Sequence, residues 1–352
     1  MPVLATAAQA PAADPRTGGR PVGRARRLRR LGLAAAALLL AVLASICIGG
    51  QPSSLAEAWH AVATPSGTVM DVTIRELRWP RTLTGIVVGA CLGLAGTLVQ
   101  GHTRNPIADP GLLGINQGAA LAIVAATTFW GQQTAGVEAT LAFTGALAAS
   151  ILVFLLGSAS RHGATPITLV LAGAAVTALC HGLVSGLVLL NEEALDTLRF
   201  WQIGSLAGRD GGLDLVAPFI LAGLLLALAN LGALNTLALG EDTATALGTG
   251  VLRSRIVGIA AIALLSGSAV TLAGPIAFAG LVIPHLARAA MGGDHRWLMP
   301  FSLLAGATLV LLADTAGRVV ARPGELSVGV VLAVIGAPLF VRLARRKRLV
   351  AL

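Results

Sequence analysis

The chain has 352 residues, of which 55% are hydrophobic and 12% are charged, and it contains 43 glycines and no tyrosine. Its apolar runs repeatedly exceed the roughly 18 residues that mark a bilayer-spanning helix, and no hydrophilic block between them is long enough to form a soluble domain. A net charge of +9 could indicate nucleic-acid binding, but the basic residues gather at the two chain ends beside apolar runs. Composition therefore excludes a soluble globular protein and favours a polytopic membrane protein.

The first 30 residues are rich in Ala, Pro and Arg and have no apolar periodicity. We predict a disordered basic cytoplasmic tail over residues 1–30 and a single transmembrane domain over residues 31–352. A signal peptide is the alternative for this end of the chain, but the apolar run after Arg30 is longer than the usual signal core and no soluble domain follows it. An uncleaved first helix is therefore the better interpretation.

Apolar runs between polar, Pro/Gly or charged breaks predict an all-α membrane protein of about ten transmembrane helices. The runs lie at residues 31–50, 82–100, 114–131, 138–158, 166–190, 213–233, 255–273, 275–291, 297–313 and 326–344. The division between the seventh and eighth depends on the Gly-Pro break of "LAGPIAFAG". An even number of spans puts both termini on one side, and the arginine-rich ends place that side in the cytoplasm by the positive-inside rule.

This orientation leaves most basic residues inside: seven in the N-terminal tail, six in loops and five at the C-terminus. The exceptions are Arg75, Arg78, Arg81, Arg199, Arg209, Arg318 and Arg322. A single interfacial arginine usually reaches for lipid headgroups. A cluster of outward-facing arginines also admits a second interpretation, an acidic protein that docks from outside, because Arg forms bidentate pairs with carboxylates.

Small and polar residues within the spans are interpreted as packing residues. Gly85, Gly89 and Gly93 lie four apart on one face of the second span, a pattern that permits close helix contact, and Gly182 and Gly186 repeat it in the fifth. His181 is interpreted as a satisfied packing histidine. The three cysteines, which lack any metal-binding or disulfide spacing, are interpreted in the same way: Cys47, Cys91 and Cys180.

Several chemistries are absent from the sequence. The only lysine is Lys347, so the chain contains no G-x-x-x-x-G-K-[ST] phosphate loop and does not hydrolyse ATP in that manner. No catalytic grouping or metal-binding cluster stands out. An ion-coupled carrier usually needs ionisable groups at mid-membrane depth, whereas Asp314 and Glu325 lie near helix ends. Energy for transport must therefore come from elsewhere, or the protein is a passive channel.

Three segments together resemble one family, the FecCD-type permeases of ABC importers for iron-siderophores, haem or vitamin B12. They are "LRWPRTLTGIVVGACLGLAGTLVQGHTRNPIADPGLLGINQGAAL" at 77–121, "GPIAFAGLVIPHLAR" at 274–288 and "DTAGRVVARPGELSVGVVLAVIGAPLFVRLARR" at 314–346. The resemblance implies ten helices per subunit, as in the vitamin B12 importer permease. It also implies a second permease, two ATPase subunits that bind ATP-Mg, and an extracytoplasmic substrate-binding protein. This chain would then bind no cofactor and would not itself be an enzyme.

The family resemblance also implies roles for particular residues. Arg78 and Arg81 of the R-x-P-R motif, with Arg318, would pair with glutamates of the binding protein; Trp79 stands where the family commonly has leucine. The first cytoplasmic gate segment would contain Asn105, Pro106, Asp109 and Pro110, and these X-Pro pairs resist helix formation. The loop 160–168 would form the second, with Thr165 and Pro166 at the start of the fifth helix.

The insertion "LNTLALGEDTATALGTGVLRSR" at 234–255 resembles the loop that couples the permease to its ATPase, with Glu241, Asp242, Ala246 and Gly248 as the chosen residues. Asp242 or Thr243 is expected to cap a short helix that Gly248 ends. The alternative is an ordinary cytoplasmic turn without a coupling role.

The function implied is an ABC importer permease in the bacterial cytoplasmic (inner) membrane, with ferric siderophore as the favoured cargo and haem or vitamin B12 as alternatives. The form "NPIADPGLLG" resembles that of family members that often pair with a second, different permease, and this resemblance implies a heterodimer rather than a homodimer. An ion-coupled secondary transporter that works alone is the alternative from another class; it predicts inverted repeats and mid-membrane charges, and neither is found.

Overall fold

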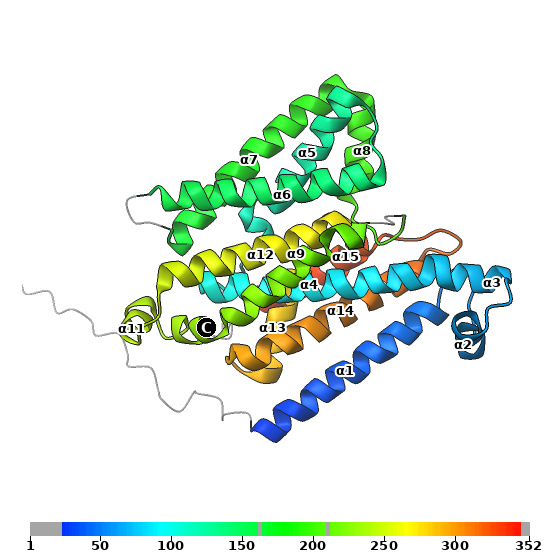
Figure 1. Ribbon diagram of the computed structural model, residues 1–352, viewed down its shortest axis with the longest axis horizontal. Helices are drawn as coiled ribbons and strands as arrows, with labels where there is room; N and C mark the ends of the chain where they lie inside the picture. The colour runs from blue at the N-terminus through cyan, green and yellow to red at the C-terminus, as the bar shows by residue number, and fades with distance from the viewer. Residues whose placement is uncertain (1–22, 161–163, 209–211, 346–352) are drawn as a thin grey trace, which may run out of the picture.

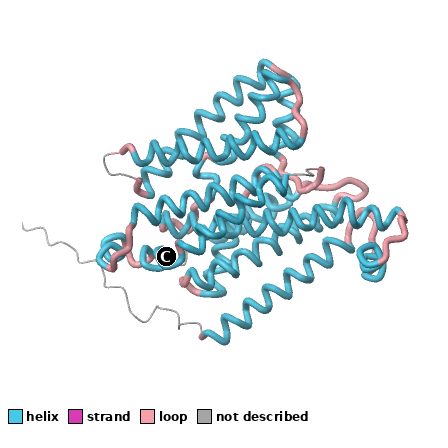
Figure 2. The backbone as a smooth tube through the Cα atoms, viewed as in Figure 1, coloured by secondary structure: helices cyan, strands magenta, loops and turns pink. Residues whose placement is uncertain are grey.

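A computed structural model describes residues 23–160, 164–208 and 212–345, and every regular element in these ranges is a helix (Figures 1 and 2). The long helices are α1 (Arg24–Cys47), α4 (Trp79–Thr103), α5 (Ile115–Trp130), α6 (Ala135–Ser158), α7 (Pro166–Leu190), α9 (Gly212–Ala229), α12 (Val251–Ala273), α13 (Ala279–Met291), α14 (His295–Val320) and α15 (Val328–Arg345). The short ones are α2 (Leu55–Ala63), α3 (Val69–Val72), the π-helix η2 (Thr73–Arg78), the 3₁₀-helix η3 (Pro110–Leu113), α8 (Glu192–Gln202), α10 (Leu231–Leu237) and α11 (Glu241–Ala246).

Each of the ten predicted spans coincides with one of the long helices, and the all-helical membrane fold is confirmed. Within the described ranges, seven helices are long and apolar enough to cross a membrane: α1, α4 with the short helices before it, α6, α7, α9, α12 and α14. The helices α13 and α15 are shorter apolar helices. Ten crossings and two cytoplasmic termini therefore remain predictions.

The first helix begins earlier than the apolar run that predicted it. Residues 1–22 lie outside the described part of the chain, but residues 24–30, which the sequence placed in the tail, form the first turns of α1. Helix α1 is mostly exposed, since few of its side chains contact the rest of the bundle. The division into a tail and a membrane domain remains a prediction for residues 1–22.

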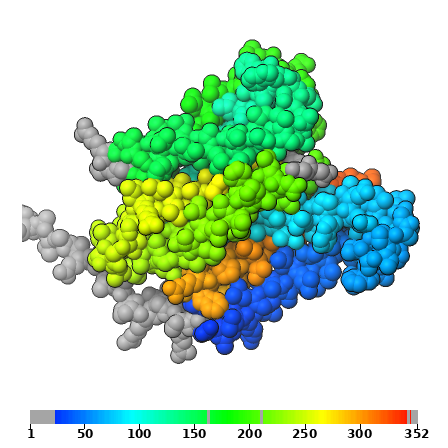
Figure 3. Space-filling view, in the orientation of Figure 1, coloured from blue at the N-terminus to red at the C-terminus, as the bar shows by residue number. Residues whose placement is uncertain are grey.

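Helix α4 forms the centre of the bundle, where it contacts α12, α13 and α14 (Figure 1). The helices α5, α6, α7 and α8 form a second group on one side, which α12 joins to the centre, and α1 lies along the opposite edge against α14. The same arrangement is visible in the space-filling view (Figure 3). Because α4 is buried over most of its length, it connects the two ends of the molecule through the core.

Glycines set the distance between α4 and its neighbours. A Cβ atom at Gly89 would clash with the carbonyl oxygen of Gly306, and one at Gly306 would clash with that of Gly89. Gly93 and Gly96 lie in the same way against backbone oxygens of Ser302 and Gly280. The prediction that the 85–93 glycine ladder permits close helix packing is confirmed, because only hydrogen side chains leave room for these backbones.

The same packing interpretation is wrong for Gly182 and Gly186 on α7 within this chain. A Cβ atom at Gly182 or Gly186 would have no atom within 4 Å, and both glycines are exposed. His181 is exposed too, so it is not a packing histidine within this chain. The sequence pattern could not show which face of α7 meets the bundle, because spacing alone does not fix the rotation of a helix that is apolar on all sides.

The sequence did not predict the short helices α2 and α8. Helix α2 begins with a capping box in which the Ser54 hydroxyl accepts from the Glu57 amide (3.2 Å) and the Glu57 carboxylate accepts from the Ser54 amide (2.7 Å). Helix α8 is capped by Asn191, whose side chain accepts from Ala194 N (3.1 Å). Both are shorter than a membrane span, so a search for spans passes over them, whereas the S-x-x-E signature marks the first.

The glycine contacts predict a difference between two small substitutions. Gly89→Ala should lower the midpoint of thermal unfolding in detergent by several degrees, because overpacking a tight contact costs about 1–3 kcal/mol. Gly182→Ala adds the same methyl group to an exposed helix position and should leave the midpoint unchanged or slightly raised. Equal midpoints for the two variants would contradict the close α4–α14 contact.

Candidate functional site

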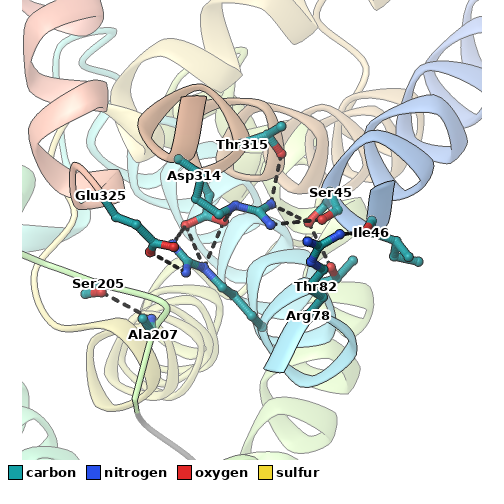
Figure 4. Close-up of polar contacts among 11 residues, drawn as sticks. Ser45, Ile46, Arg78, Thr82, Ser205, Ala207, Asp314, Thr315 and Glu325 are labelled. Atoms are coloured by element: carbon teal, nitrogen blue, oxygen red, sulfur yellow. Dashed lines mark hydrogen bonds and ion pairs between the residues drawn. The ribbon is translucent and has the colours of Figure 1, made fainter. Parts of the chain in front are cut away.

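Three outward-predicted arginines lie together where α1, α4 and α14 meet (Figure 4). Arg81, in the first turn of α4, donates from Nε and Nη2 to the carboxylate of Asp314 on α14 over 2.8–3.1 Å. Its Nη1 donates to Glu325, just before α15, at 2.6 Å. Arg81 therefore joins α4 to α14 and to the segment that begins α15.

Arg318 lies one turn after Asp314 on α14 and is the second arginine that pairs with the Asp314 carboxylate. Its Nε is 3.2 Å from Asp314 Oδ2, and its other nitrogens donate to the backbone oxygen (2.9 Å) and hydroxyl (3.0 Å) of Ser45 in α1. The Ser45 hydroxyl also contacts the Thr82 hydroxyl at 2.7 Å. Arg318 is only 3% exposed, so these contacts use a guanidinium that water scarcely reaches.

Arg78 holds the chain that leaves α1. Its guanidinium donates to the carbonyl oxygens of Ile46 (2.8 Å) and Gln51 and to the hydroxyl of Ser53 (2.9 Å). Carbonyl groups at a helix C-terminus lack partners within the helix, and a cation beside them satisfies both their hydrogen bonds and the helix dipole. Arg78 is 6% exposed and therefore closes the end of α1.

The structure thus brings the three predicted docking residues together, and it shows their side chains engaged within the chain. Arg81 is the most accessible of the three, beside Glu325, whose side chain is 45% exposed. Arg75 and Arg322 are exposed at the same end, and Arg322 donates to Gly49 O (2.7 Å). Docking by Arg78, Arg81 and Arg318 remains a prediction.

Sequence reasoning missed the role of Asp314. This carboxylate is 1% exposed and is shared by Arg81 and Arg318. The available signal was an acidic residue at the end of an apolar run, because such a residue is costly in a membrane unless it is paired. The sequence places Asp314 near a helix end but does not indicate which cations pair with it.

The first predicted gate segment, between α4 and α5, is a network of local turns. The side chain of Asn105 accepts from Ile107 N (3.1 Å), and that of Asp109 accepts from Gly111 N (2.8 Å). As expected, the residue before each proline, Asn105 and Asp109, is not helical: α4 ends at Thr103, and η3 begins at Pro110. Burial raises the pKa of the Asp109 carboxyl, and the hydrogen bond from Gly111 acts in the opposite direction.

Two buried side chains hold this gate segment against the core. Gln100 Nε2 donates to the carbonyl oxygens of Ala108 (3.2 Å) and Leu281 (3.3 Å), and Arg288 on α13 donates to Gln100 Oε1. Pro110 lies on Gly280, where a Cβ atom would come within 2.7 Å of the proline ring. Gln100, Arg288 and Gly280 were not selected from the sequence.

The second predicted gate segment leads into α7, which contacts η3. Thr165 caps α7 by accepting from Thr168 N (3.2 Å), and α7 begins at Pro166 as predicted. Residues 161–163 of this segment lie outside the described part of the chain. A Cβ atom at Gly173 on α7 would clash with the carbonyl oxygen of Leu112 in η3. The structure therefore connects Thr165 and Pro166 to the first gate segment through α7.

The predicted coupling segment contains the short helices α10 and α11. Gly248, at φ +82°, ends α11 as predicted. The predicted cap is wrong: α11 starts at Glu241 after Gly240, so Asp242 and Thr243 lie inside the helix. Gly240 has φ +106°, a conformation that favours glycine and turns the chain into α11 without a side-chain cap.

Glu241 joins the coupling segment to the first gate segment. Its carboxylate pairs with Arg104 (3.3 Å), which ends α4 in a left-handed conformation, and with Arg255 on α12. Asp242, Ala246 and Gly248 are exposed. Helix α4 rises about 34 Å between Arg81 and Arg104 at ~1.5 Å per residue, slightly more than the roughly 30 Å hydrocarbon core. The two charged clusters therefore lie at opposite ends of one helix.

Comparison with known proteins gives consistent results. The model of the FecCD transport family matches residues 37–346. The ferric enterobactin transport system permease protein FepD of Escherichia coli (strain K12) is 46% identical over 312 residues, which cover 88% of this chain and 93% of that protein. The probable siderophore transport system permease protein YfiZ of Bacillus subtilis (strain 168) is 42% identical over 314 residues, covering 88% and 93%.

A solved structure described as an inward-facing conformation of a putative metal-chelate type ABC transporter has a TM-score of 0.77 and 30% sequence identity. The match covers 91% of this chain and 99% of the other.

The shared carboxylate predicts a large stability effect. Asp314→Asn should destabilise the fold by about 3–5 kcal/mol, because it leaves Arg81 and Arg318 without their buried counter-charge. Asp196→Asn removes the same charge from an exposed i,i+3 pair with Arg199 and should have little effect. Thermal unfolding in detergent measures both variants, and similar midpoints would show that Asp314 is not the residue that holds the cluster.

Proposed function

Because the chain belongs to the FecCD transport family, we propose that it is the permease subunit of an ABC importer that carries a ferric siderophore across a bacterial cytoplasmic membrane. The observation that carries this proposal is the 46% identity to a ferric enterobactin permease over most of both chains. Haem and vitamin B12 remain the alternative cargoes.

We propose that two separate ATPase subunits bind and hydrolyse ATP-Mg, as membership of the family implies. The chain itself, with Lys347 as its only lysine, has no phosphate loop. We further propose a second permease, in a heterodimer rather than a homodimer, and a substrate-binding protein that docks at the outer end. Purification of the complex and identification of its second permease test the heterodimer directly.

The proposed mechanism uses both ends of α4. The binding protein contacts the Arg81 end, and the ATPase contacts α11, which Glu241 joins to the gate segment at Arg104. Each ligand shifts the equilibrium between outward-open and inward-open states only if it binds one of them more tightly. A helix that is closely packed over its whole length provides a mechanical connection between the two binding events.

Transport assays in proteoliposomes test the function. The complex of permease, ATPase and binding protein should take up iron-loaded siderophore when ATP is enclosed with the ATPase subunits, and not when the ATPase is omitted. Uptake by the permease alone, driven by a proton or sodium gradient, would instead establish a secondary transporter. Competition among ferric catecholate, ferric hydroxamate, haem and vitamin B12, each with its own binding protein, identifies the cargo.

The exposed position of Glu325 predicts a specific docking effect. We propose that a carboxylate of the binding protein replaces Glu325 on Arg81. Arg81→Gln should then weaken association about tenfold, in a salt-dependent way, because a charge-assisted hydrogen bond is lost. Glu325→Gln should strengthen association, because it removes the competing carboxylate. Binding to the immobilised complex measures both effects.

Two controls accompany this docking experiment. Arg199→Gln removes an exposed cation on α8 and should leave docking unchanged, and association with the ATPase should be the same for all three variants. If Glu325→Gln weakened docking as much as Arg81→Gln, the cluster would be structural only.

The pairing of Glu241 predicts a coupling defect. Glu241→Gln should lower transport severalfold at unchanged ATP hydrolysis, because α11 loses its charged connection to Arg104 and Arg255. Asp242→Gln is the matched control, since it also removes a carboxylate from the first turn of α11, where none of the ion pairs found in the described residues involves it. Equal ratios of transport to hydrolysis in wild type and Glu241→Gln would contradict the proposal.

A further inference from the structure

A groove of about 640 Å³ lies between α1, α13 and α14, away from both charged clusters described above. Its walls come from all three helices: Arg30, Leu33, Ala34 and Ala37 of α1, Ile283, Leu286, Ala289 and Ala290 of α13, and Phe301, Ala305, Thr308, Leu309 and Leu312 of α14. In Figure 1, α1 runs along the outer edge of the bundle, so the groove lies at the periphery of the molecule.

The groove is apolar except at one end. Thr308 uses its hydroxyl within α14, where it donates to Leu304 O (2.8 Å). Arg30 donates to the carbonyl oxygen of Ala290 in the last turn of α13 and lies at the end where α1 and α14 both begin. A long apolar surface with one cation at its end matches a molecule with an apolar chain and an anionic head.

The length of the groove corresponds to one leaflet of a bilayer. Its residues on α14 extend from Phe301, near the Arg30 end, to Leu312, which is about 16 Å at ~1.5 Å per residue. The hydrocarbon core is about 30 Å thick, so one leaflet contributes about 15 Å. Trp297, one turn before Phe301, has the position expected of an indole at the membrane–water interface.

The Arg30 end carries an excess of positive charge. The first turns of α1 contain Arg24, Arg26, Arg27, Arg29 and Arg30. Arg26 lies one turn before Arg30, on the face that Leu33, Ala34 and Ala37 continue into the groove. Among the described residues, the carboxylate that pairs with these arginines is Asp294, which is 3.7 Å from Arg27. Arg27 also lies 5.8 Å from the ring centroid of Trp297. Arg30 lines the groove and Arg26 lies one turn before it, and none of the ion pairs found in the described residues involves either of them.

We propose that this groove binds one anionic phospholipid from the leaflet that faces the start of α1, with an acyl chain along α13 and α14 and the phosphate between Arg26 and Arg30. Basic side chains at a helix end beside an apolar inter-helical surface are the features by which membrane proteins select anionic headgroups. A transmembrane helix of a partner is a poorer match, because the groove is about 16 Å long, roughly half of the 30 Å that such a helix crosses. This site is separate from the proposed transport function and does not depend on the cargo.

Native mass spectrometry tests the site on the purified full-length chain in detergent. The probe is an equal mixture of phosphatidylglycerol and phosphatidylcholine with identical acyl chains. The wild-type chain should retain one phosphatidylglycerol, and the double variant Arg26→Gln/Arg30→Gln should retain it at least ~10-fold less. Ala305→Phe, which fills the middle of the groove, should also lose the lipid while all the arginines remain.

The control is Arg342→Gln/Arg345→Gln, which removes the same charge from exposed positions at the end of α15 and should retain the lipid. Thermal unfolding checks that the Ala305→Phe variant is folded. If it is not, Ala37→Phe, which fills the groove from the exposed wall of α1, is used as the groove-filling variant.

Four results would overturn the proposal. If Arg342→Gln/Arg345→Gln lost as much phosphatidylglycerol as Arg26→Gln/Arg30→Gln, the lipid would be attracted by positive charge in general. If folded Ala305→Phe retained all of its phosphatidylglycerol, the headgroup would bind without the groove. Equal retention of phosphatidylcholine would show that the headgroup is not selected. A photoreactive residue at position 37 should yield a lipid adduct in phosphatidylglycerol vesicles, and a protein adduct in its place would assign the groove to a partner subunit.

Discussion

The end of the bundle where α1, α4 and α14 meet depends on one buried carboxylate. Asp314 balances Arg81 and Arg318, which in turn bind Glu325 and the end of α1, so three helices and the segment before α15 are joined through a single acidic side chain. Because Asp314 and Arg318 are almost fully buried, each must find its partner within the protein. The arginines therefore have a structural role within the chain. A docking partner can bind them only by replacing one of their internal contacts, because neither Arg81 nor Arg318 carries a free charge.

The opposite end of the bundle uses the same kinds of contact in a different arrangement. Glu241 connects α11 to Arg104 and Arg255, while Gln100 and Arg288 hold the neighbouring gate segment from the core side. The backbone of this segment is bonded to side chains of α4, so a change at α11 reaches the gate over a few contacts. Between the two ends, glycine contacts leave α4 little freedom to tilt independently of α14.

The sequence predicted the long helices well, because apolar runs, proline and glycine breaks directly reflect the physics of the bilayer. It also predicted the α4 glycine contact and the non-helical segment 105–109. It could not predict that Gly182 and Gly186 face outward, because that depends on how α7 is rotated in the bundle. The start of α11 was misplaced because Gly240 replaces a side-chain cap with a backbone turn. The partners of Asp314 were missed because they lie far away along the chain and meet it only in the folded protein.

The contact between Gly89 and Gly306 has a consequence for how the protein is made. The two residues belong to helices at opposite ends of the sequence, so their contact has a high sequence separation and forms late. During synthesis, α4 enters the membrane long before α14 exists, and its glycine face must remain without its final partner through most of translation. A chain whose synthesis stops before residue 306 would therefore leave the glycine face of α4 without its contact on α14. An exposed glycine face on the central helix is a physical difference by which unfinished chains could be distinguished from complete ones.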